Sequence, residues 1–216
     1  MRIGIAGTQT TELVAKTIKE ILSDAGFESF YFKNNSKTTL ADLVIVLGGD
    51  RGVRNYLHSA IDVDTPVLGI SESESNGVLA QIELKELPSY LNRIKKQDYV
   101  IEDVPRIGVK VDGKNTYPVL NDVAVFTSKS ATLMEHILRI NGEEVWHDSS
   151  DGVIISTPIG SSAYSMSAGG PVIFQAANVF GIISVNSLDI TRRPIIVSDN
   201  SIIEIDEISS RLHCDV

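Results

Sequence analysis

Three short segments of the sequence place polar side chains within or directly after apolar runs, and two of them also contain glycine. They are GGD (48–50), the dipeptide Asn121-Asp122, and TPIGSSAYSMSAGG (157–170), which follows the apolar run GVIIS. Glycine lets a ligand approach backbone N–H groups, and small hydroxyl side chains leave space for it. These segments therefore indicate sites for a bulky polar ligand.

The first segment places a carboxylate, Asp50, at the end of the apolar run 41–47. Such a run without alternation is typical of a parallel strand buried on both faces. Ligands of open α/β sheets bind at the carboxyl ends of these strands, where a carboxylate can accept a proton or hold a metal ion. The alternative is an ordinary strand-to-helix turn in which Asp50 caps the helix. The tripeptide alone favours neither interpretation.

The second segment, Asn121-Asp122, interrupts a run that is otherwise suited to burial. A buried polar group without a partner costs about 1–3 kcal/mol, so both residues need partners. The neighbouring hydroxyls of a ribose would serve. The alternative is a β-bulge or strand edge where both side chains meet water, and taken alone the dipeptide favours this alternative.

The third segment predicts a strand that ends at Thr157 and a short helix from Gly160 to about residue 168. Small residues at a helix N-terminus leave N–H donors free for a flat or anionic group. Tyr164 can lie beside a base, and Asp151 adds a carboxylate ahead of the strand. The alternative is a tightly packed strand–helix corner. The density of small polar groups favours the ligand site.

The elements that must position these segments fall into two predicted domains, 1–97 and 98–216. The first alternates strands and helices, which predicts an open, Rossmann-like α/β sheet. Its predicted strands are 2–7, 28–33, 41–47 and 65–70, and its predicted helices are 11–26, 53–61 and 86–96.

The second predicted domain is β-rich. Hairpin turns are expected at Asp112-Gly113 and Asn141-Gly142. The predicted strands are 99–111, 117–127, 132–140, 145–157, 181–187, 193–198 and 201–208.

Composition narrows the class of partner. The formal net charge of −9 argues against nucleic acid, because neutralising phosphates needs a basic face. No apolar run approaches the roughly 18 residues of a membrane span, and residues 1–10 do not resemble a signal peptide. The single cysteine, Cys214, rules out an intramolecular disulfide and fits an expected cytoplasmic location. Neither a P-loop nor G-x-G-x-x-G is present, which disfavours conventional P-loop NTPases and Rossmann dehydrogenases.

Taken together, the segments resemble the NAD kinase family, over nearly the whole chain. That family carries GGDGT, Asn-Glu, GDG and TPTGSTAY…GGP in this order. The counterparts here are GGDRG (48–52), Asn121-Asp122, SDG (150–152) and TPIGSSAYSMSAGGP (157–171), and SLDITRRPIIV (187–197) resembles a later strand entry. The TP-x-GS-x-AY pattern is highly specific, whereas GGD alone would be weak.

The resemblance implies transfer of a phosphoryl group from ATP or polyphosphate to the 2′-hydroxyl of the adenosine ribose of NAD, giving NADP. It implies Mg²⁺ or another divalent cation and a homodimer or homotetramer. Asp50 would be the acid–base residue. The resemblance implies that the phosphates are bound by Gly48, Gly49, Arg51 and Gly52. Ribose hydroxyls would be bound by Asn121, Asp122 and Asp151, and Asp151 would act on the ligand of its own or of a neighbouring subunit. The adenosine would be surrounded by Thr157, Gly160, Ser162, Ala163 and Tyr164.

The sequence departs from the family pattern in the phosphate segment. Arg51 replaces a glycine and Gly52 a threonine, so Arg51 either contacts the donor phosphates or blocks them. Asp122 is one methylene shorter than glutamate. A family segment GIN-x-G-x-LGF is only faintly visible in 69–82, and no residue is carried over from it.

Two rival functions follow from these departures. One is a non-catalytic NAD(P)-binding regulator of the same family. The other is a lipid or sphingoid kinase of the same superfamily, which also uses GGD but which the 157–164 segment disfavours.

Overall fold

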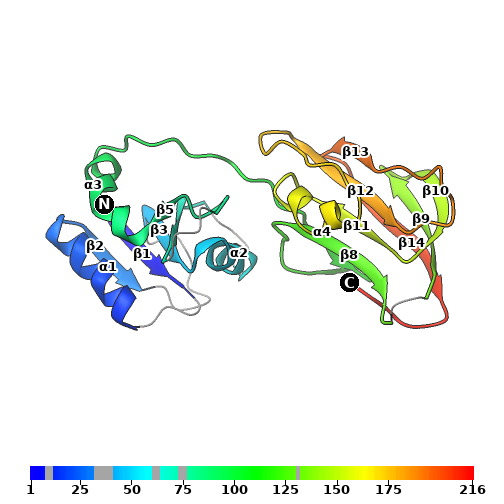
Figure 1. The fold of residues 1–216 in the computed structure, drawn as a ribbon, viewed down its shortest axis with the longest axis horizontal. Helices are drawn as coiled ribbons and strands as arrows, with labels where there is room; N and C mark the ends of the chain where they lie inside the picture. The colour runs from blue at the N-terminus through cyan, green and yellow to red at the C-terminus, as the bar shows by residue number, and fades with distance from the viewer. Residues whose placement is uncertain (8–11, 32–40, 60–63, 73–76, 130–131) are drawn as a thin grey trace. The chain divides into compact units, whose positions relative to one another are not determined.

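The computed structural model describes residues 1–216 except 8–11, 32–40, 60–63, 73–76 and 130–131 (Figure 1). The chain divides into two compact units, Met1–Asp103 and Val104–Val216. The boundary expected from the sequence, 97/98, lies slightly before this division. Parts of the predicted elements 2–7, 11–26, 28–33 and 53–61 border or enter the ranges outside the described residues.

The first unit is an α/β domain with a five-stranded parallel sheet of order β2-β1-β3-β4-β5. The strands are β1 Arg2–Ala6, β2 Glu28–Tyr31, β3 Leu43–Leu47, β4 Val67–Ser71 and β5 Ile82–Glu83. The helices are α1 Glu12–Asp24, α2 Gly49–Ser59, the 3-10 helix Leu84–Glu86 and α3 Leu87–Lys95. The open α/β sheet predicted from the sequence is confirmed.

The strand β3 is buried along its whole length, as its run without alternation predicts. Its even-numbered residues pack with Val53 of α2, and its odd-numbered residues join the cluster to which α1 and α3 contribute. Helices therefore cover both faces of β3. Its carboxyl end delivers Gly48 and Gly49 to the edge of the sheet where ligands bind in this class of fold.

The second unit is β-rich (Figure 1). Two antiparallel sheets share one core, and residues 110–111 and 114–115 form a separate two-stranded sheet. The larger sheet has the order β13-β12-β11-β8-β15 and the smaller β10-β9-β14. Val153 and Phe180 of the larger sheet pack with Met134 and Leu138 of the smaller. The strands are β6 Lys110–Val111, β7 Lys114–Asn115, β8 Asp122–Thr127, β9 Met134–Ile140, β10 Glu143–Ser150, β11 Gly152–Ser156, β12 Val179–Val185, β13 Ile195–Ser198, β14 Ile203–Ser210 and β15 Cys214–Asp215.

Both predicted hairpin turns of the second unit are present. Asp112 and Gly113 have φ angles of 50° and 76° between β6 and β7, and Asn141 and Gly142 have 54° and 82° between β9 and β10. Positive φ at both central residues is what the tight hairpin turns require. The short-range turn signals therefore set these two connections.

The strand predicted over 99–111 is wrong for most of its length. Only Lys110–Val111 forms a strand, and Ile107 makes an isolated bridge with Val119. Val100 is 88% exposed, so this apolar residue does not pack on a sheet. Pro105 also lacks an N–H group to donate. Among the described residues, no helix is long and apolar enough to cross a membrane.

Candidate functional site

Gly48 and Gly49 form the turn at the carboxyl end of β3, with φ angles of +98° and +64°. Glycine adopts this region without strain. The helix α2 begins at Gly49, whereas the sequence predicts a helix only from residue 53. The GGDRG segment is therefore the first turn of the helix rather than a loop before it. Asp50 favours this early start, because a carboxylate interacts well with a helix N-terminus.

Gly52 lies in the first turn of α2, directly against β3. Its N–H group donates to the Gly48 carbonyl over 3.0 Å. A Cβ atom at this position would overlap the backbone carbonyl of Leu47. Gly52 thus lets the helix start immediately after the strand, which is a packing role.

The Asp50 carboxylate binds the backbone of the segment before β5. Its Oδ2 accepts the Val78 N–H over 2.9 Å, and its Oδ1 accepts those of Leu79 and Ala80 over 3.0 and 2.8 Å. A Cβ atom on Gly77 would overlap this carboxylate. Asp50 lies inside α2, so the alternative in which it caps the helix is not observed. One side chain instead holds residues 77–80 against the start of α2.

These contacts limit what else Asp50 can do. Three of the roughly four lone-pair positions of a carboxylate are engaged, which leaves one on Oδ2 for a ligand hydroxyl or a metal ion. Within the described residues, no group of three or more His, Cys, Asp and Glu side chains is arranged to hold a metal ion. Mg²⁺, which the family resemblance implies, is usually held by one or two carboxylates together with substrate phosphates, so it does not require such a group.

The sequence reasoning missed the role of Val78, Leu79 and Ala80. Their contribution is their N–H groups, so their side-chain types gave no signal; only the faint match over 69–82 pointed to this stretch. Arg51 is exposed on α2, which leaves its guanidinium open to an anionic ligand. Further along α2, burial raises the pKa of Tyr56, which packs into the cluster around Val53.

In the second unit, Asn121 is attached directly to the start of the 157–170 segment, although Asn121 and Thr157 are 36 residues apart. The Thr157 N–H donates to the Asn121 carbonyl over 2.8 Å. The buried Thr157 hydroxyl lies 2.6 Å from the Leu120 carbonyl oxygen and accepts the Gly160 N–H over 3.0 Å. A Cβ atom on Gly160 would overlap the Asn121 carbonyl. Two of the predicted segments are thereby fixed to each other.

The dipeptide Asn121-Asp122 lies at the start of β8, beside the end of β11. The pairing of the two strands runs without a bulge from Asp122–Ser156 to Phe126–Gly152, so the bulge alternative is not observed. Both side chains are partly buried. The Asn121 side-chain oxygen is buried and has no hydrogen-bond partner among the described residues. Such an acceptor suits a hydroxyl donor on a ligand.

The segment 160–170 folds as two short helical turns instead of one helix. They are the 3-10 helix Gly160–Ser162 and α4 Tyr164–Ser167, and Gly169 ends the second with a φ of +88°. The N–H groups of Gly160 and Ser161 already donate to Thr157. The prediction of free donors at a helix N-terminus is therefore wrong for these two residues, because the turn after β11 uses them itself.

The remaining predicted residues of this segment are accessible. Tyr164 is 47% exposed and stacks on Phe126 of β8, with ring centroids 5.7 Å apart and an interplanar angle of 25°. Ser162 is exposed, and its hydroxyl donates to the Ile159 carbonyl over 3.2 Å; Ala163 is partly buried. Phe126 thus supports one face of the Tyr164 ring while much of the ring stays open to a flat ligand.

Asp151 lies in the turn between β10 and β11. Its N–H donates to the Val185 carbonyl over 2.9 Å, and its Oδ2 accepts the Asn186 side-chain amide over 2.8 Å. Thr157 follows the opposite end of β11, about 20 Å away at the usual strand rise. The structure therefore does not bring Asp151 together with residues 157–164 within this unit.

Both units match domains of a known protein family. Residues 8–99 match the ATP-NAD kinase N-terminal domain, and residues 120–216 match the ATP-NAD kinase C-terminal domain. An NAD kinase of Clostridium botulinum is 32% identical over 198 residues, which cover 87% of this chain and 69% of that protein. The chain belongs to the NAD kinase family.

Other members of the NAD kinase family support the same placement. An NAD kinase of Methanopyrus kandleri is 31% identical over 165 residues, covering 76% of this chain but 59% of that protein. The chain thus spans between about three fifths and seven tenths of these relatives' lengths. The crystal structure of an NAD kinase from Archaeoglobus fulgidus in complex with ATP superposes with a TM-score of 0.79 at 27% identity, covering 95% of this chain and 80% of that one.

Proposed function

We propose that the chain is an NAD kinase that transfers a phosphoryl group from ATP or polyphosphate to the 2′-hydroxyl of the adenosine ribose of NAD. The observation that carries this proposal is the attachment of Asn121 to Thr157 and Gly160. It brings together glycine backbone, small hydroxyls and an amide oxygen that has no partner among the described residues, in one partly buried place, as a ribose and a base require. Family membership supports the same conclusion.

In this proposal the second unit binds the dinucleotide. Asn121 and Asp122 hold ribose hydroxyls, and Tyr164 stacks on the adenine with Phe126 behind it. Ser162 and Ala163 border the adenosine. Asp151 contacts the nicotinamide-side ribose, in the same or in a neighbouring subunit.

The first unit supplies the reacting carboxylate. The 2′-oxygen of NAD attacks the terminal phosphorus of the donor, the bond from that phosphorus to its bridging oxygen breaks, and the hydroxyl proton passes to Oδ2 of Asp50. The three N–H groups on Asp50 fix the direction of that oxygen. When bound, Mg²⁺ would neutralise the donor phosphates and be held mainly by their oxygens, because the one free position on Asp50 accepts the hydroxyl proton. Gly48, Gly49 and Arg51 would face the phosphates, since phosphoryl transfer depends mainly on positioning and charge neutralisation.

The test is to incubate the full chain with NAD, Mg²⁺ and either ATP or polyphosphate, and to measure NADP with an NADP-specific dehydrogenase. NADP formed with one donor is the expected result and identifies that donor. NAD binding by calorimetry without NADP from either donor would indicate the non-catalytic regulator. Phosphorylation of a sphingoid base without NAD binding would indicate the lipid kinase.

Arg51 distinguishes the kinase from the regulator more directly. If it contacts the donor, Arg51→Ala raises the KM for ATP and leaves NAD binding unchanged. Arg54→Ala, which removes another exposed arginine from the same helix, is the matched control. If Arg51 blocks the donor instead, Arg51→Gly, which leaves Gly52 in its close contact with the Leu47 carbonyl, creates or raises activity.

We further propose a cytoplasmic homodimer or homotetramer. Asp151 and Thr157 lie about 20 Å apart within one chain. This separation supports binding sites that are shared between subunits, in which Asp151 of a second copy completes the site around Thr157. The single cysteine fits the location. Light scattering should give a mass of a multiple of the 23.5 kDa chain; a monomer at micromolar concentration with NAD present would contradict it.

A further inference from the structure

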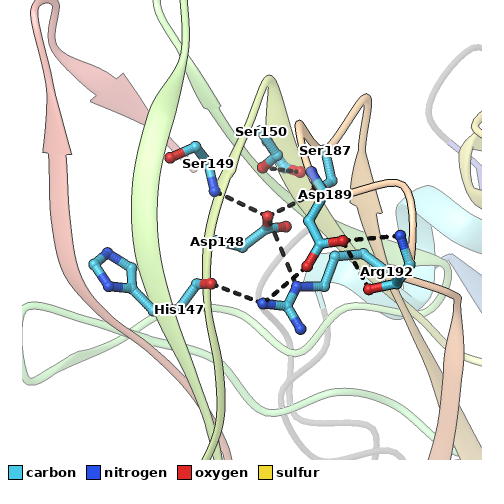
Figure 2. Close-up of polar contacts among 9 residues, drawn as sticks. His147, Asp148, Ser149, Ser150, Ser187, Asp189 and Arg192 are labelled. Carbon is cyan, nitrogen blue, oxygen red and sulfur yellow. Dashed lines mark hydrogen bonds and ion pairs between the residues drawn. The ribbon is translucent and has the colours of Figure 1, made fainter.

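A polar network attaches residues 187–192 to β10 in the second unit (Figure 2). The Ser187 hydroxyl donates to Oδ1 of Asp148 over 2.6 Å. The Leu188 N–H donates to the Ser149 carbonyl over 2.9 Å, and the Arg192 guanidinium donates to the His147 carbonyl over 3.1 Å. Three successive residues of β10 thus hold both ends of this segment.

Asp148 is the centre of the network, and its side chain is only 1% exposed. Oδ1 also accepts the Ser149 N–H over 2.9 Å and lies 3.9 Å from Nε of Arg192. The Arg192 guanidinium lies over the Trp146 ring, 5.3 Å from its centroid, and pairs with Asp189. The Thr191 hydroxyl and N–H, with Arg192, hold the pKa of Asp189 below its usual range. A buried carboxylate is costly unless it is hydrogen-bonded. Oδ1 of Asp148 has such partners, whereas its Oδ2 is buried with no hydrogen-bond partner among the described residues.

The apolar residues of the same segment point the other way. Leu188 is 67% exposed and Ile190 is 84% exposed, while Ser187 and Arg192 turn toward β10. Burying two aliphatic side chains would stabilise the segment more simply than burying a carboxylate. The network therefore fixes the position of residues 187–192 and adds little hydrophobic stabilisation.

The position that the network sets is that of Asn186, the residue before Ser187. Asn186 has a φ of +51°, in the left-handed region, and its amide donates to the Asp151 carboxylate over 2.8 Å. A series of contacts therefore connects Asp148, through Ser187 and Asn186, to the Asp151 carboxylate. Asp151 belongs to the SDG segment that resembles the GDG of the NAD kinase family, whereas Asp148, Ser187 and Arg192 lie outside the residues predicted to bind ligand.

We infer that Asp148 and Ser187 are positioning residues for the dinucleotide site: they hold Asn186 so that it orients the Asp151 carboxylate toward a ribose hydroxyl of NAD. This inference rests on the proposed function. It predicts that loss of the Ser187 hydroxyl weakens NAD binding without slowing the chemical step.

The test compares Ser187→Ala with the wild-type chain in steady-state assays. We expect the KM for NAD to rise about three- to tenfold, the factor that one net hydrogen bond supplies, with kcat within about twofold. Ser187→Thr keeps the hydroxyl and should restore wild-type KM. Asp148→Asn keeps an acceptor for Ser187 and should affect KM less than Asp148→Ala. Ser210→Ala is the matched control, because that hydroxyl also donates a hydrogen bond within this unit, to the Leu133 carbonyl, but lies on β14, which β9 separates from β10.

A double-mutant cycle shows whether Ser187 acts through Asp151. In an Asp151→Ala background, Ser187→Ala should change the KM for NAD by less than about twofold, because the carboxylate that Ser187 helps to orient is no longer present. An unchanged KM in Ser187→Ala, or a full multiplicative effect in the double variant, overturns the inference. Absence of NAD binding by the wild-type chain in calorimetry would instead overturn the proposed function, and the inference with it.

Discussion

The two units hold their candidate ligand segments by different means. In the first, one charged side chain, Asp50, binds the N–H groups of residues 78–80. In the second, Thr157, Gly160 and the Asn121 backbone contact one another through neutral hydrogen bonds and close packing. In the first unit, a single carboxylate both carries the charge and holds the segment in place. In the second unit, several small residues together hold the segment in place.

Because of this difference, substitutions in the two units should affect different properties of the protein. A change at Asp50 removes a charge and releases a backbone segment at once, so it should act on turnover. A change at the Thr157–Gly160 turn alters shape in a buried strand connection, so it should act on stability and on dinucleotide affinity. The following substitutions test this separation.

The largest effect is expected for Asp50→Asn. This variant keeps the shape of the side chain but loses basicity and charge, and its amide cannot accept all three N–H groups. Turnover should fall at least about 10²-fold, while the Kd for NAD stays within a few-fold of wild type. Asp42→Asn is the matched control, since Asp42 accepts a single backbone N–H in the same unit.

Two outcomes would change the role of Asp50. Near-normal turnover in Asp50→Asn would make it a structural residue, and complete loss of NAD binding would make it a substrate-holding one. Gly77→Ala separates direct from indirect action, because its Cβ displaces the carboxylate without altering its chemistry. If Asp50 acts mainly by holding residues 78–80, hydrogen exchange at these amides should rise in both variants together.

The next effect is expected at Gly160. In Gly160→Ala the new Cβ would overlap the Asn121 carbonyl, so the turn must move away from β8. The free energy of unfolding should fall by about 1–3 kcal/mol, as for other overpacked sites, and NAD binding should weaken. Gly108→Ala is the control, because no atom of the described residues, apart from its own and its chain neighbours', lies within 4 Å of a Cβ built there. Equal urea midpoints for the two variants would contradict the close approach.

The sequence predicts those parts of this site that depend on local pattern. The apolar run of β3 with its terminal glycines, the hairpin turns at Asp112-Gly113 and Asn141-Gly142, and the strand before Thr157 all follow from near neighbours. The start of α2 at Gly49 was missed because glycine lowers helix propensity, although the first turn tolerates it.

Long-range polar contacts could not be predicted in the same way. Asp50 reaches residues 28–30 positions ahead and uses only their N–H groups, which every residue except proline carries. The bond from Ser187 to Asp148 joins positions 39 apart, and a serine and an aspartate in polar stretches give no sign of pairing. Such contacts emerge only from the register of the folded sheets.

A smaller effect on the second unit is expected from Tyr164→Ala. If the exposed ring stacks on the adenine, the variant should lose about 1–3 kcal/mol of NAD binding while its melting temperature changes little. Tyr164→Phe keeps the stack on Phe126 and is the matched control. An unchanged Kd with a large fall in melting temperature would assign Tyr164 to packing alone.

The smallest effect concerns pH and the buried polar side chains behind the second site. His136 is fully buried on β9 and pairs across the strands with Asp148. Burial lowers the pKa of His136 more than the Asp148 charge raises it, and His147 lowers it slightly further. In the unfolded chain, histidine takes up a proton near pH 6.5. The unfolded state therefore binds more protons just below that pH, so the contribution of His136 to stability is complete above about pH 6.5 and is lost as the pH falls.

The comparison that isolates this contribution is between wild type and His136→Leu, measured as urea unfolding free energies from pH 8 to pH 5. The wild-type value should fall more steeply below pH 6.5 than that of the variant, by at most about 1.4 kcal/mol per pH unit. Met134→Leu is the control, because it changes another fully buried side chain of β9 without removing a titratable group. Parallel curves for wild type and His136→Leu would show that His136 takes up its proton in the folded state as readily as in the unfolded one. Acid sensitivity of the second unit would then have to come from its other titratable groups.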